Sequence, residues 1–504
     1  MSNIEHQTAI HAPRGAVTLA REEALLFETS VEDRIGFELP PLDVPDREVN
    51  DLIPAALTRP DIAGMPELSE VDVVRHYTRL SQWNYSIDTG MYPLGSCTMK
   101  YNPRINEVVA ALPGFTCSHP LQPARQVQGN LRIMYELGRY LAAISGMDEI
   151  SLQPAAGAQG ELTGMMVIKA YHEHNGHHDR DLVLIPNTAH GTNPASSALC
   201  GYRTVELHTD ARGNLDLESL KQHLSDKVAA LMVTNPNTIG LFEEGISEAI
   251  RLVHSCGGMV YCDGANLNAL MGKTRPGDWG ADVLHFNLHK TFSTPHGGGG
   301  PGAGPIGVKS HLAPFLPVPQ VVRTDAGYDL AFDRPHSIGK VMGFFGNFGV
   351  MIKAFAYIRT MGPDGLRLAS ETAVLNANYV KESLRADFNL PYDRTCKHEV
   401  VFNDEKQSDC GAVTLDIAKR LMDYGFHPPT IYFPLIVHGA LMIEPTETES
   451  LDTLDEFIAA MKAIAAEAKQ NCALLHEAPV RTFRARLDET TAARKPILRW
   501  RPSP

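Results

Sequence analysis

Short apolar runs alternate with helical patterns between about residues 180 and 290. Each run is followed by polar residues or a turn, which predicts buried strands at 182–185, 204–207, 228–234, 259–262 and 283–286. Apolar residues at helical spacing predict helices between these strands, for example at 217–224 and 246–254. Strands and helices that alternate in this way predict an α/β domain with a mainly parallel sheet.

Helical patterns flank the alternation on both sides. Apolar residues recur every three or four positions in residues 128–144. After residue 340 the pattern changes to an α+β one, with helices predicted at 348–361, 372–387, 412–424 and 451–470 and a strand-like run at 441–443. We therefore predict three parts, which are an N-terminal arm at residues 1–70, a large domain at 71–350, and a smaller C-terminal domain with a tail at 351–504.

Two regions lack such a pattern. The first 60 or so residues are polar and punctuated by proline, which is typical of an extended arm or a set of short helices. Residues 92–104 contain two prolines and several polar side chains. Because proline disfavours both helix and central strand, this second region is predicted to be a loop with a fixed course.

The composition excludes several classes of protein. The 504 residues are 43% hydrophobic and 21% charged, which argues against wholesale disorder. The net charge of −14 disfavours contact with phosphate backbones, so we expect no nucleic-acid partner. No long uncharged apolar run predicts a transmembrane helix, and the N-terminus lacks an apolar signal core, so we expect a cytoplasmic protein without a membrane partner. The eight cysteines form no C-x-x-C pair, and reduced thiols are expected for most of them.

A lysine follows the predicted strand at 283–286. Lys290 stands in the segment 287–296, which precedes four glycines at 297–300. Burial disfavours the charge of a lysine, and a desolvated lysine amine is a good nucleophile for a Schiff base. The glycines allow the backbone to approach a ligand closely. A surface lysine in a glycine-rich turn is the alternative that this motif alone leaves open.

An aspartate stands at the end of the preceding strand. Asp263 follows the run at 259–262 and lies 27 positions before Lys290. Pyridoxal phosphate needs a carboxylate that keeps its pyridine nitrogen protonated, because the ring then accepts an electron pair. Asp263 suits that role, and the small side chain of Ala265 would let the ring lie flat. A turn-capping aspartate is the alternative.

Two further motifs belong to the same pattern. His190 follows the strand at 182–185, and its planar imidazole could stack on a cofactor ring, although a loop histidine bonded to the backbone is the alternative. Residues 153–161 are rich in glycine and small residues and enter a helical run, and the backbone N–H groups of a helix start can bind phosphate. Ligands of parallel sheets bind at the carboxyl ends of strands, so three motifs at strand ends and one at a helix start together predict a site.

A histidine cluster is the main candidate for metal binding. His172, His174, His177 and His178 surround an Asn-Gly turn. Their spacing fits no standard metal site, so we expect a solvated helix end and predict no metal. The Walker pattern, H-E-x-x-H and G-x-S-x-G are also absent from the sequence.

Ten segments of the chain together resemble the glycine decarboxylase family, the P-proteins of the glycine cleavage system. The resemblance runs from about residue 65 to the end and covers Pro93–Pro103, His119–Pro123, Gln126–Gly129, Ala189–Pro194, Thr234–Thr238, Cys262–Asn268, the Lys290 segment, Phe345–Gly349, Glu444–Glu449 and Ala492–Trp500. Single-chain members are about twice as long. This chain resembles their C-terminal, lysine-bearing half, and thus the second subunit of the two-subunit bacterial form.

The resemblance implies a fold-type I enzyme dependent on pyridoxal 5′-phosphate, with a mainly parallel, seven-stranded type of large domain and a smaller α+β domain. Lys290 would hold the cofactor as an internal aldimine, Asp263 would pair with the pyridine nitrogen, and His190 would stack on the ring. The other implied cofactor contacts are Ala265, His289 beside the phosphate or aldimine, and Gly157, Ala158 and Gln159 at the phosphate.

The resemblance also implies residues near the substrate and one departure from the family pattern. The implied substrate residues are Asn235 and the loop from Ser96 to Lys100, with Ser96, Cys97 and Thr98 foremost. Many relatives have Asn-Ser where this chain has Ala155-Ala156, so backbone groups must replace a serine hydroxyl at the phosphate.

The implied activity is that of a glycine dehydrogenase (aminomethyl-transferring). Glycine would be decarboxylated with release of CO2, and its aminomethyl group would pass to the lipoyl arm of H-protein. The implied partners are lipoylated H-protein and the first P-protein subunit, in a heterotetramer of two of each. Two alternatives stay open, which are another fold-type I enzyme acting on a small amino acid and a non-catalytic partner subunit. The presence of Lys290 argues against the latter.

Overall fold

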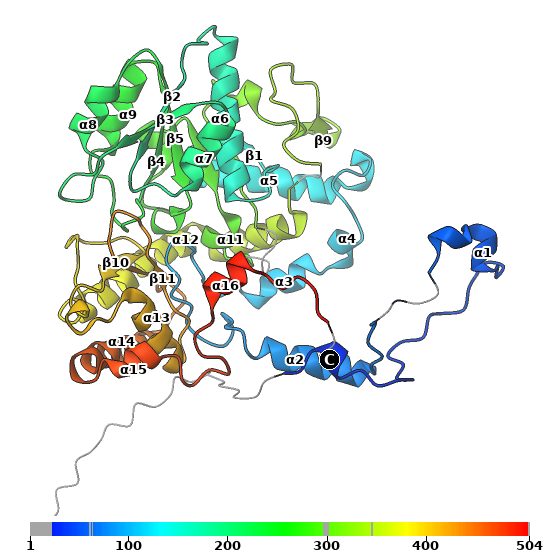
Figure 1. Ribbon diagram of the computed structural model, residues 1–504. Coiled ribbons are helices and arrows are strands. Elements are labelled where there is room, and N and C mark those ends of the chain that lie inside the picture. The colour runs from blue at the N-terminus through cyan, green and yellow to red at the C-terminus, as the bar shows by residue number, and fades with distance from the viewer. Residues whose placement is uncertain (1–22, 60–61, 63, 296–301, 344–345, 502–504) are drawn as a thin grey trace, which may run out of the picture. The chain divides into compact units, whose positions relative to one another are not determined.

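The computed structural model describes residues 23–59, 62, 64–295, 302–343 and 346–501 (Figure 1). The glycines at 297–300 and Phe345, which the sequence motifs include, lie outside the described residues. The chain divides into two compact units. The smaller comprises Met1–Gly90, Met422–Gly425 and Glu477–Pro504, and the larger comprises Met91–Leu421 and Phe426–His476. The division into an arm, a large domain and a small domain with boundaries after residues 70 and 350 stays a prediction.

A seven-stranded sheet forms the centre of the larger unit, in the order β1-β7-β6-β5-β4-β2-β3 (Figure 1). The neighbours from β3 through β2, β4 and β5 to β6 are parallel, and β7 runs antiparallel to both of its neighbours. The strands are β1 (Glu149–Ser151), β2 (Leu182–Pro186), β3 (Arg203–Leu207), β4 (Val228–Thr234), β5 (Met259–Gly264), β6 (Val283–Phe286) and β7 (Ile306–Val308). The five predicted strands and the mainly parallel α/β fold are confirmed.

Helices cover both faces of this sheet. Successive strand residues point to opposite faces, so Val183 and Ile185 pack with α6, whereas Leu184 packs with α8 and α9. The helices of this part are α5 (Gln128–Ser145), α6 (Gly157–His174), α7 (Thr192–Leu199), α8 (Leu217–His223), α9 (Ile246–Ser255), α10 (Pro276–Trp279) and α11 (Leu288–Thr291). The predicted helices are present, and α6 begins at Gly157, within the segment 153–161 that was predicted to lead into it.

A second group of elements follows the sheet. The antiparallel sheet β10-β12-β11 comprises β10 (Val400–Asn403), β12 (Ala440–Ile443) and β11 (Thr430–Ile431). The accompanying helices are α12 (Phe348–Leu384), α13 (Thr414–Asp423), α14 (Leu451–Gln470) and α15 (Ala473–Glu477). α12 joins the two helices predicted at 348–361 and 372–387. Its regular path is broken at Gly362, where φ is +61°, and Pro363 then begins the second half.

The remaining elements of the larger unit are short. They are α3 (Arg104–Ala110), α4 (Pro113–Thr116), the hairpin β8 (Gln320–Thr324) and β9 (Gly327–Ala331), and 3₁₀ turns at Ala124–Gln126, Leu267–Ala269, Ala313–Phe315 and Ser408–Cys410. Residues 92–103 form no helix and no extended strand, as predicted for the loop at 92–104, whereas its last residue, Arg104, begins α3.

The smaller unit contains both ends of the described chain. α2 (Glu70–Ser81) begins with a capping box, in which Ser69 and Asp72 satisfy backbone N–H groups of the first turn. Trp83 stacks on Phe483 with 3.8 Å between ring centroids, and Phe27 stacks on Trp500. The other elements are α1 (Val49–Leu52), α16 (Glu489–Arg494) and 3₁₀ turns at Leu26–Glu28 and Ala55–Leu57.

Most of the cysteines are free thiols, as expected, but two of them are paired. Cys410 and Cys472 form a disulfide, whereas the other six cysteines are free thiols. The two residues are 62 positions apart, and they meet because the end of α14 packs beside the turn at Ser408–Cys410. Sequence spacing carries no signal for such a tertiary contact.

Candidate active site

The carboxyl ends of the parallel strands bring three of the predicted residues to one edge of the sheet. Asp263 lies near the end of β5, His190 lies between β2 and α7, and Lys290 lies in α11, directly after β6. The charge of Lys290 acts on both Asp263 and His190. The structure therefore places these residues within electrostatic reach of one another, as the strand-end argument predicts.

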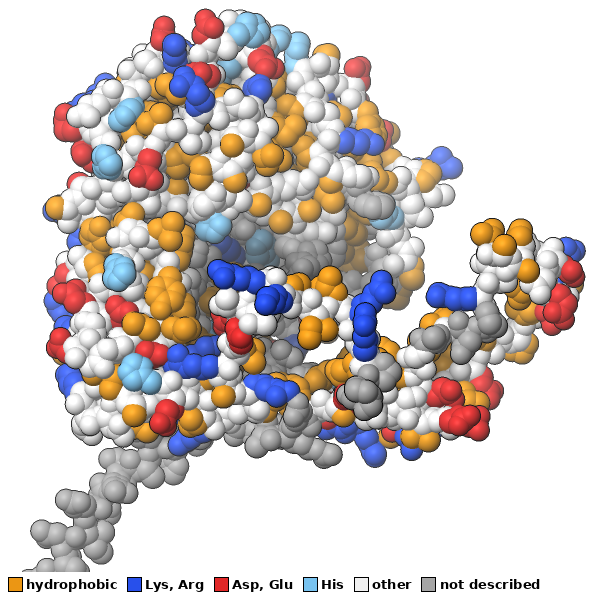
Figure 2. All heavy atoms as spheres, viewed as in Figure 1, with side chains coloured by type: hydrophobic (Ala, Val, Ile, Leu, Met, Phe, Trp, Pro, Cys, Tyr) orange, Lys and Arg blue, Asp and Glu red, His pale blue; other side chains and the backbone are white. Residues whose placement is uncertain are grey.

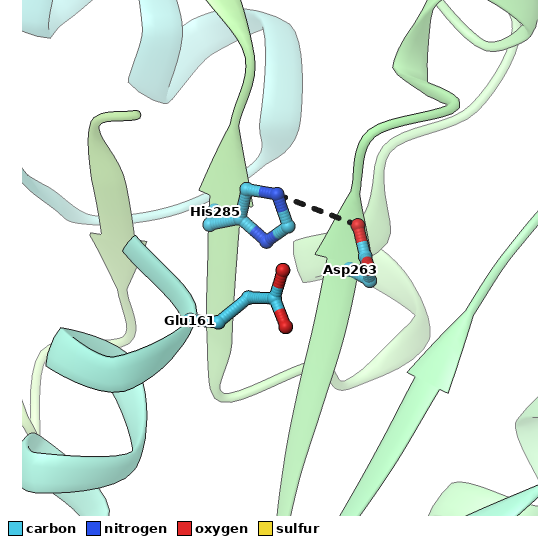
Figure 3. A group of neighbouring side chains, drawn as sticks. All are labelled: Glu161, Asp263 and His285. Carbon is cyan, nitrogen blue, oxygen red and sulfur yellow. Dashed lines mark ion pairs between the residues drawn. The ribbon is translucent and has the colours of Figure 1, made fainter. Parts of the chain in front are cut away.

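Asp263 is buried and surrounded by polar groups (Figure 3). His285 Nε2 lies 3.4 Å from Asp263 Oδ1, and the backbone N–H of Ala265 donates to the same oxygen at 2.9 Å. Asn193 Nδ2 lies 3.3 Å from Asp263 Oδ2 and donates to Glu161 Oε2 at 2.6 Å. Side chains from α6, α7, β5 and β6 thus converge on one carboxylate.

Two carboxyl groups of this cluster differ in their ionisation. Burial alone would raise the pKa of Asp263, but His285, the Ala265 amide, Lys290 and Asn193 outweigh it and lower that pKa below its ordinary value. Burial and the charge of Asp263 raise the pKa of Glu161 to about 8. At neutral pH the cluster therefore contains an ionised Asp263 beside a protonated Glu161.

A hydrogen-bonded chain fixes the ring of His285. Tyr261 Oη lies 2.6 Å from His285 Nδ1, and Asn287 Nδ2 lies 2.7 Å from His285 Nε2. All three side chains are buried. Burial lowers the pKa of His285 and the charge of Asp263 opposes this, while the hydrogen bonds hold the ring at the edge of the sheet.

His190 leads into the first turn of α7. Its Nδ1 is hydrogen-bonded to the hydroxyl of Thr192, and the ring packs edge-on against Phe433 with 5.7 Å between centroids. Desolvation lowers the pKa of His190 against the opposing charge of Asp263. A neutral ring that keeps an exposed surface can stack on a planar ligand.

The N-terminus of α6 has no side-chain cap. Its N-cap residue, Ala156, offers no side-chain acceptor, so the first backbone N–H groups of the helix are available to an anion. Gln159 does not point its amide at that space, because it accepts from Ala155 N at 2.7 Å and donates to Val341 O at 2.7 Å. Gly157 and Ala158 have no polar side-chain atoms, so the first turn of α6 offers an anion only backbone groups.

His289 lies beside Gly302 and Ala303. Its Nδ1 accepts from the backbone N–H of Ala303 at 3.3 Å. A Cβ at Gly302 would lie 2.4 Å from the same ring, so only glycine permits this approach.

The loop at residues 92–101 reaches Lys290. Lys290 Nζ donates to the carbonyl of Ser96 at 2.7 Å, and the backbone N–H of Ser96 donates to Glu399 Oε2 at 2.8 Å. Ser96 has φ +65°, an unfavourable left-handed conformation for a serine. Burial raises the pKa of the neighbouring Cys97 thiol, and Thr98 is buried.

Lys100 anchors this loop. Its Nζ lies 2.8 Å from Glu447 Oε1, 2.8 Å from Asn268 Oδ1 and 3.3 Å from Tyr357 Oη, all in the interior. These partners come from three separate parts of the chain. Lys100 itself is fully engaged, so its place is structural, whereas Ser96 and Cys97 are the loop residues that interact with Lys290.

Asn235 directly follows β4. Its Oδ1 accepts from the backbone N–H of Glu243 at 3.0 Å, whereas its buried Nδ2 has no hydrogen-bond partner among the described residues. An unpartnered buried donor is costly. It is suited to a ligand acceptor at this edge.

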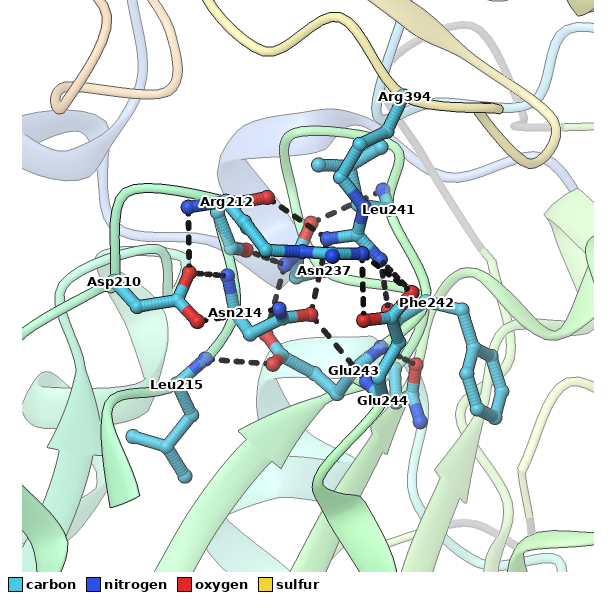
Figure 4. Close-up of polar contacts among 12 residues, drawn as sticks. Asp210, Arg212, Asn214, Leu215, Asn237, Leu241, Phe242, Glu243, Glu244 and Arg394 are labelled. Atoms are coloured by element: carbon cyan, nitrogen blue, oxygen red, sulfur yellow. Dashed lines mark hydrogen bonds and ion pairs between the residues drawn. The ribbon is translucent and has the colours of Figure 1, made fainter. Parts of the chain in front are cut away.

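A polar network fixes the segment that follows Asn235 (Figure 4). Glu243 accepts from Asn237 Nδ2 and from the backbone N–H of Leu215, both at 2.7 Å. Arg394 donates to Arg212 O at 2.8 Å and pairs with Glu244 at 2.9 Å. Arg394 thereby ties the segment after α12 to the loops after β3 and β4.

Five polar residues of the site were missed from the sequence. Glu161 and Asn193 lie inside motifs that the sequence analysis singled out, so a signal was present but gave no role. His285 is a polar residue within the apolar run 283–286, which is an unusual pattern for a buried strand. Glu399 and Glu444 come from a different part of the chain, and only the quoted Glu444–Glu449 segment pointed to one of them.

The histidine cluster is only partly a solvated helix end. His174, His177 and His178 are exposed at the end of α6, where Figure 2 shows pale blue side chains gathered. The expectation is wrong for His172, which is buried and lies 3.0 Å from Ala229 O through its Nε2. His172 lies on the inner face of α6. Because it is two positions from His174, helical spacing places the two side chains on opposite sides of the helix.

Comparisons with known proteins agree with this geometry. A family model described as aminotransferase class-V matches residues 160–300, and one described as glycine dehydrogenase, C-terminal domain, matches residues 369–479. A crystal structure of inhibitor-bound glycine decarboxylase (P-protein) of the glycine cleavage system has a TM-score of 0.70 at 20% identity and covers 82% of this chain and 94% of its own. The fold and its strand-end lysine define the chain as a fold-type I protein.

Two curated relatives identify the family. The probable glycine dehydrogenase (decarboxylating) subunit 2 of Caldanaerobacter subterraneus subsp. tengcongensis is 59% identical over 482 residues, which is 96% of this chain and 99% of the relative. The protein of the same name from Halalkalibacterium halodurans is 58% identical, over 95% of this chain and 98% of the relative. The chain belongs to the family of glycine dehydrogenase (decarboxylating) subunit 2. No helix among the described residues is long and apolar enough to cross a membrane.

Proposed function

We propose that this chain is the lysine-bearing subunit of a glycine dehydrogenase (aminomethyl-transferring), which decarboxylates glycine and transfers the aminomethyl group to a lipoyl arm. The observation that carries this proposal is the 59% identity over 96% of the chain to a relative named for that activity. The convergence of Lys290, Asp263 and His190 at one sheet edge supports it, because the electron pair left by decarboxylation needs an electron sink, and a lysine with a carboxylate partner can hold pyridoxal phosphate for that role.

The residues at this edge fit pyridoxal 5′-phosphate. A buried, ionised Asp263 suits a protonated pyridine nitrogen, and the uncapped N-terminus of α6 suits a phosphate. Thr291 Oγ1, beside Lys290, is buried without a hydrogen-bond partner among the described residues. When bound, the cofactor supplies an electron sink for the pair left behind as the bond to CO2 breaks.

The chain's own residues would then have separate tasks. Lys290 Nζ holds the cofactor covalently, and Asp263 holds the proton at the ring nitrogen. His190 packs on the ring face, Ala265 leaves room beside it, and His289 lies by the phosphate or the lysine. The backbone N–H groups of Gly157, Ala158 and Gln159 bind the phosphate.

The substrate side is proposed to lie between two loops. Ser96 and Cys97 interact with Lys290, Thr98 follows them in the loop, and the unpartnered Nδ2 of Asn235 offers a donor after β4. The partners are a first P-protein subunit, in a heterotetramer of two of each, and lipoylated H-protein. We place this activity in the cytoplasm.

The test is covalent trapping of the cofactor. The purified chain, loaded with pyridoxal phosphate, is reduced with borohydride, and the modified peptide is identified by mass spectrometry. We expect the label on Lys290 and no label in Lys290→Ala, while Lys273→Ala, a surface control paired with Glu371, is labelled as the wild type is. Glycine should perturb the cofactor absorbance, whereas a larger amino acid or cysteine should not. Labelling of another lysine in place of Lys290, or a response to cysteine alone, would contradict the proposal.

A further inference from the structure

A second buried group of titratable residues lies next to Lys290. His398 and Glu399 directly precede β10, and Glu444 directly follows β12. The two strands are antiparallel with Val400 opposite Ile443, so all three residues lie at the same end of this small sheet. Each has no solvent-exposed surface. The sheet geometry therefore concentrates two carboxyl groups and an imidazole in the interior.

Several polar atoms of this group have no hydrogen-bond partner among the described residues. His398 Nε2 lies 4.0 Å from a carboxylate oxygen of Glu399 and 4.0 Å from one of Glu444, which is beyond hydrogen-bond distance. Both ring nitrogens of His398 and Oε1 of Glu399 have no hydrogen-bond partner among the described residues. Buried polar atoms rarely lack a hydrogen-bond partner, and those that do point to a functional role.

The backbone of one residue, Ser96, connects Glu399 with Lys290. Glu399 Oε2 accepts from the backbone N–H of Ser96, and Lys290 Nζ donates to the carbonyl of the same residue. Glu399 is thus the side chain that holds Ser96 in its left-handed conformation, with the carbonyl turned to Lys290. A shift of this carboxylate would move the acceptor of the lysine.

Burial favours the protonated form of both carboxyls in this group. Burial raises the pKa of Glu399 to about 7 and, with the charge of Glu399, raises that of Glu444 well above its ordinary value. Lys290 acts on both carboxyls, Glu447 and the Thr98 hydroxyl act on Glu444, and Cys97 and Cys396 are the facing thiols. Burial lowers the pKa of His398 to about 3, so its ring stays neutral. One negative charge on this pair is therefore gained or lost near neutral pH.

A metal ion is the other ligand that three such residues could hold, since their ligating atoms lie within 4.8 Å of one another. The positive charge of Lys290 acts on all three residues and disfavours a cation there. Protonation of a buried carboxyl removes a negative charge from the interior without bringing a second cation next to Lys290. The observations therefore favour protons over a metal.

We propose that Glu399 is a positioning residue for Lys290, and that the buried Glu399–Glu444 carboxyl pair controls the pH at which the Lys290 amine becomes reactive. Glu399 acts through the backbone of Ser96, and Glu444 acts through its electrostatic interaction with Glu399. The inference deepens the proposed function, because it concerns the same lysine, but its main test needs no cofactor.

The test measures the reactivity of Lys290 in the full-length chain without cofactor. Amines are acetylated in short pulses at a series of pH values, and the Lys290 peptide is quantified by mass spectrometry with the other lysines as internal standards. An adjacent negative charge stabilises the ammonium form by about one unit or more. We therefore expect Glu399→Gln to lower the pH midpoint of Lys290 labelling by about one unit, which is about tenfold more reactive amine at a given pH.

Matched variants separate charge from structure. Glu399→Gln keeps an oxygen that can accept from Ser96 but loses the charge. Glu449→Gln is the control, because burial raises the pKa of Glu449 to about 7 while Lys290 does not act on it, and we expect no change in the midpoint. Glu444→Gln should lower the midpoint by less than Glu399→Gln, and it carries the test should the latter variant fail to fold.

Specific results would overturn the inference. An unchanged Lys290 midpoint in folded Glu399→Gln, or an equal shift in Glu449→Gln, would show that the carboxyl pair has only a structural role. With cofactor bound, the pH midpoint of the absorbance change should shift in the same order across the variants. A chain that binds no cofactor but shows the labelling shifts would contradict the proposed function and leave this inference standing.

Discussion

Asp263 is the residue on which the electrostatics of the site depend. It is ionised in the interior because His285, Ala265, Lys290 and Asn193 together outweigh the cost of burial. Such a preorganised charge stabilises a developing opposite charge more strongly than water does, since no reorganisation is needed during reaction. The carboxylate should therefore matter for rate more than for fold.

The expected effect of Asp263→Asn is a loss of about 10²–10³-fold in the rate of glycine decarboxylation, the usual cost of removing one preorganised electrostatic group. Borohydride trapping at Lys290 should persist, because the lysine is unchanged. Asp282→Asn is the control, since Asp282 is equally buried but stands at the opposite end of β6, paired with His254 at 2.8 Å. A full rate in Asp263→Asn would exclude the assigned role.

The sequence predicts some of these residues and not others, for a physical reason. Lys290, Asp263 and His190 each follow a buried strand, and parallel strands end at a common edge, so order along the chain implies proximity. Glu399 reaches Lys290 only through the fold, from 109 positions further along the chain. No local pattern distinguishes such a buried glutamate from an exposed one.

At the scale of elements, the loop at 92–101 depends on one buried ion pair. Lys100 and Glu447 lie 2.8 Å apart with side chains that are almost entirely enclosed. Because truncation of one partner leaves the other charge buried and unpaired, Lys100→Ala should lower the free energy of unfolding by about 3–5 kcal/mol.

Urea unfolding would check this value. Lys309→Ala breaks a partly exposed pair with Asp148 at 3.1 Å and should cost about 1 kcal/mol or less. Equal effects of the two variants would refute the view that Lys100 is the anchor of the loop.

A second element-scale prediction concerns the network around Glu243. Burial raises the pKa of Glu243 from 4.5 to about 7. A carboxyl whose pKa is raised by folding contributes stability that is fully present below pH 4.5 and is lost as the pH rises through 7. Between these pH values the free energy of unfolding should fall by about 3 kcal/mol more in the wild type than in Glu243→Gln. Parallel stability profiles of the two proteins would contradict the assignment.

Elements with strong periodicity were predictable, and short ones were not. The strands β2 to β6 are apolar runs bounded by polar residues, whereas β1 and β7 have three residues each and carry too little pattern to read. The hairpin β8–β9 is partly exposed and was also missed. The break in α12 comes from Gly362 and Pro363, but the pattern alone could not tell that helix resumes at once.

At the scale of the whole molecule, the sequence match to a relative named as a second subunit spans 96% of this chain and 99% of that relative. The name of that relative implies a first subunit, and the described N-terminal segment is rich in exposed apolar side chains, including Ile35, Phe37, Leu39 and Leu42. Exposed apolar surface of this kind is typical of an interaction site. The complete reaction is therefore expected from the assembled protein.

The most direct measurement is the exchange of labelled bicarbonate into the carboxyl group of glycine. This chain would be combined with the first subunit of a relative, pyridoxal phosphate and a lipoylated carrier. We expect exchange that requires this chain and is abolished by Lys290→Ala. Exchange that persists at the wild-type rate in Lys290→Ala, or no exchange by a wild-type assembly that holds the cofactor, would contradict it.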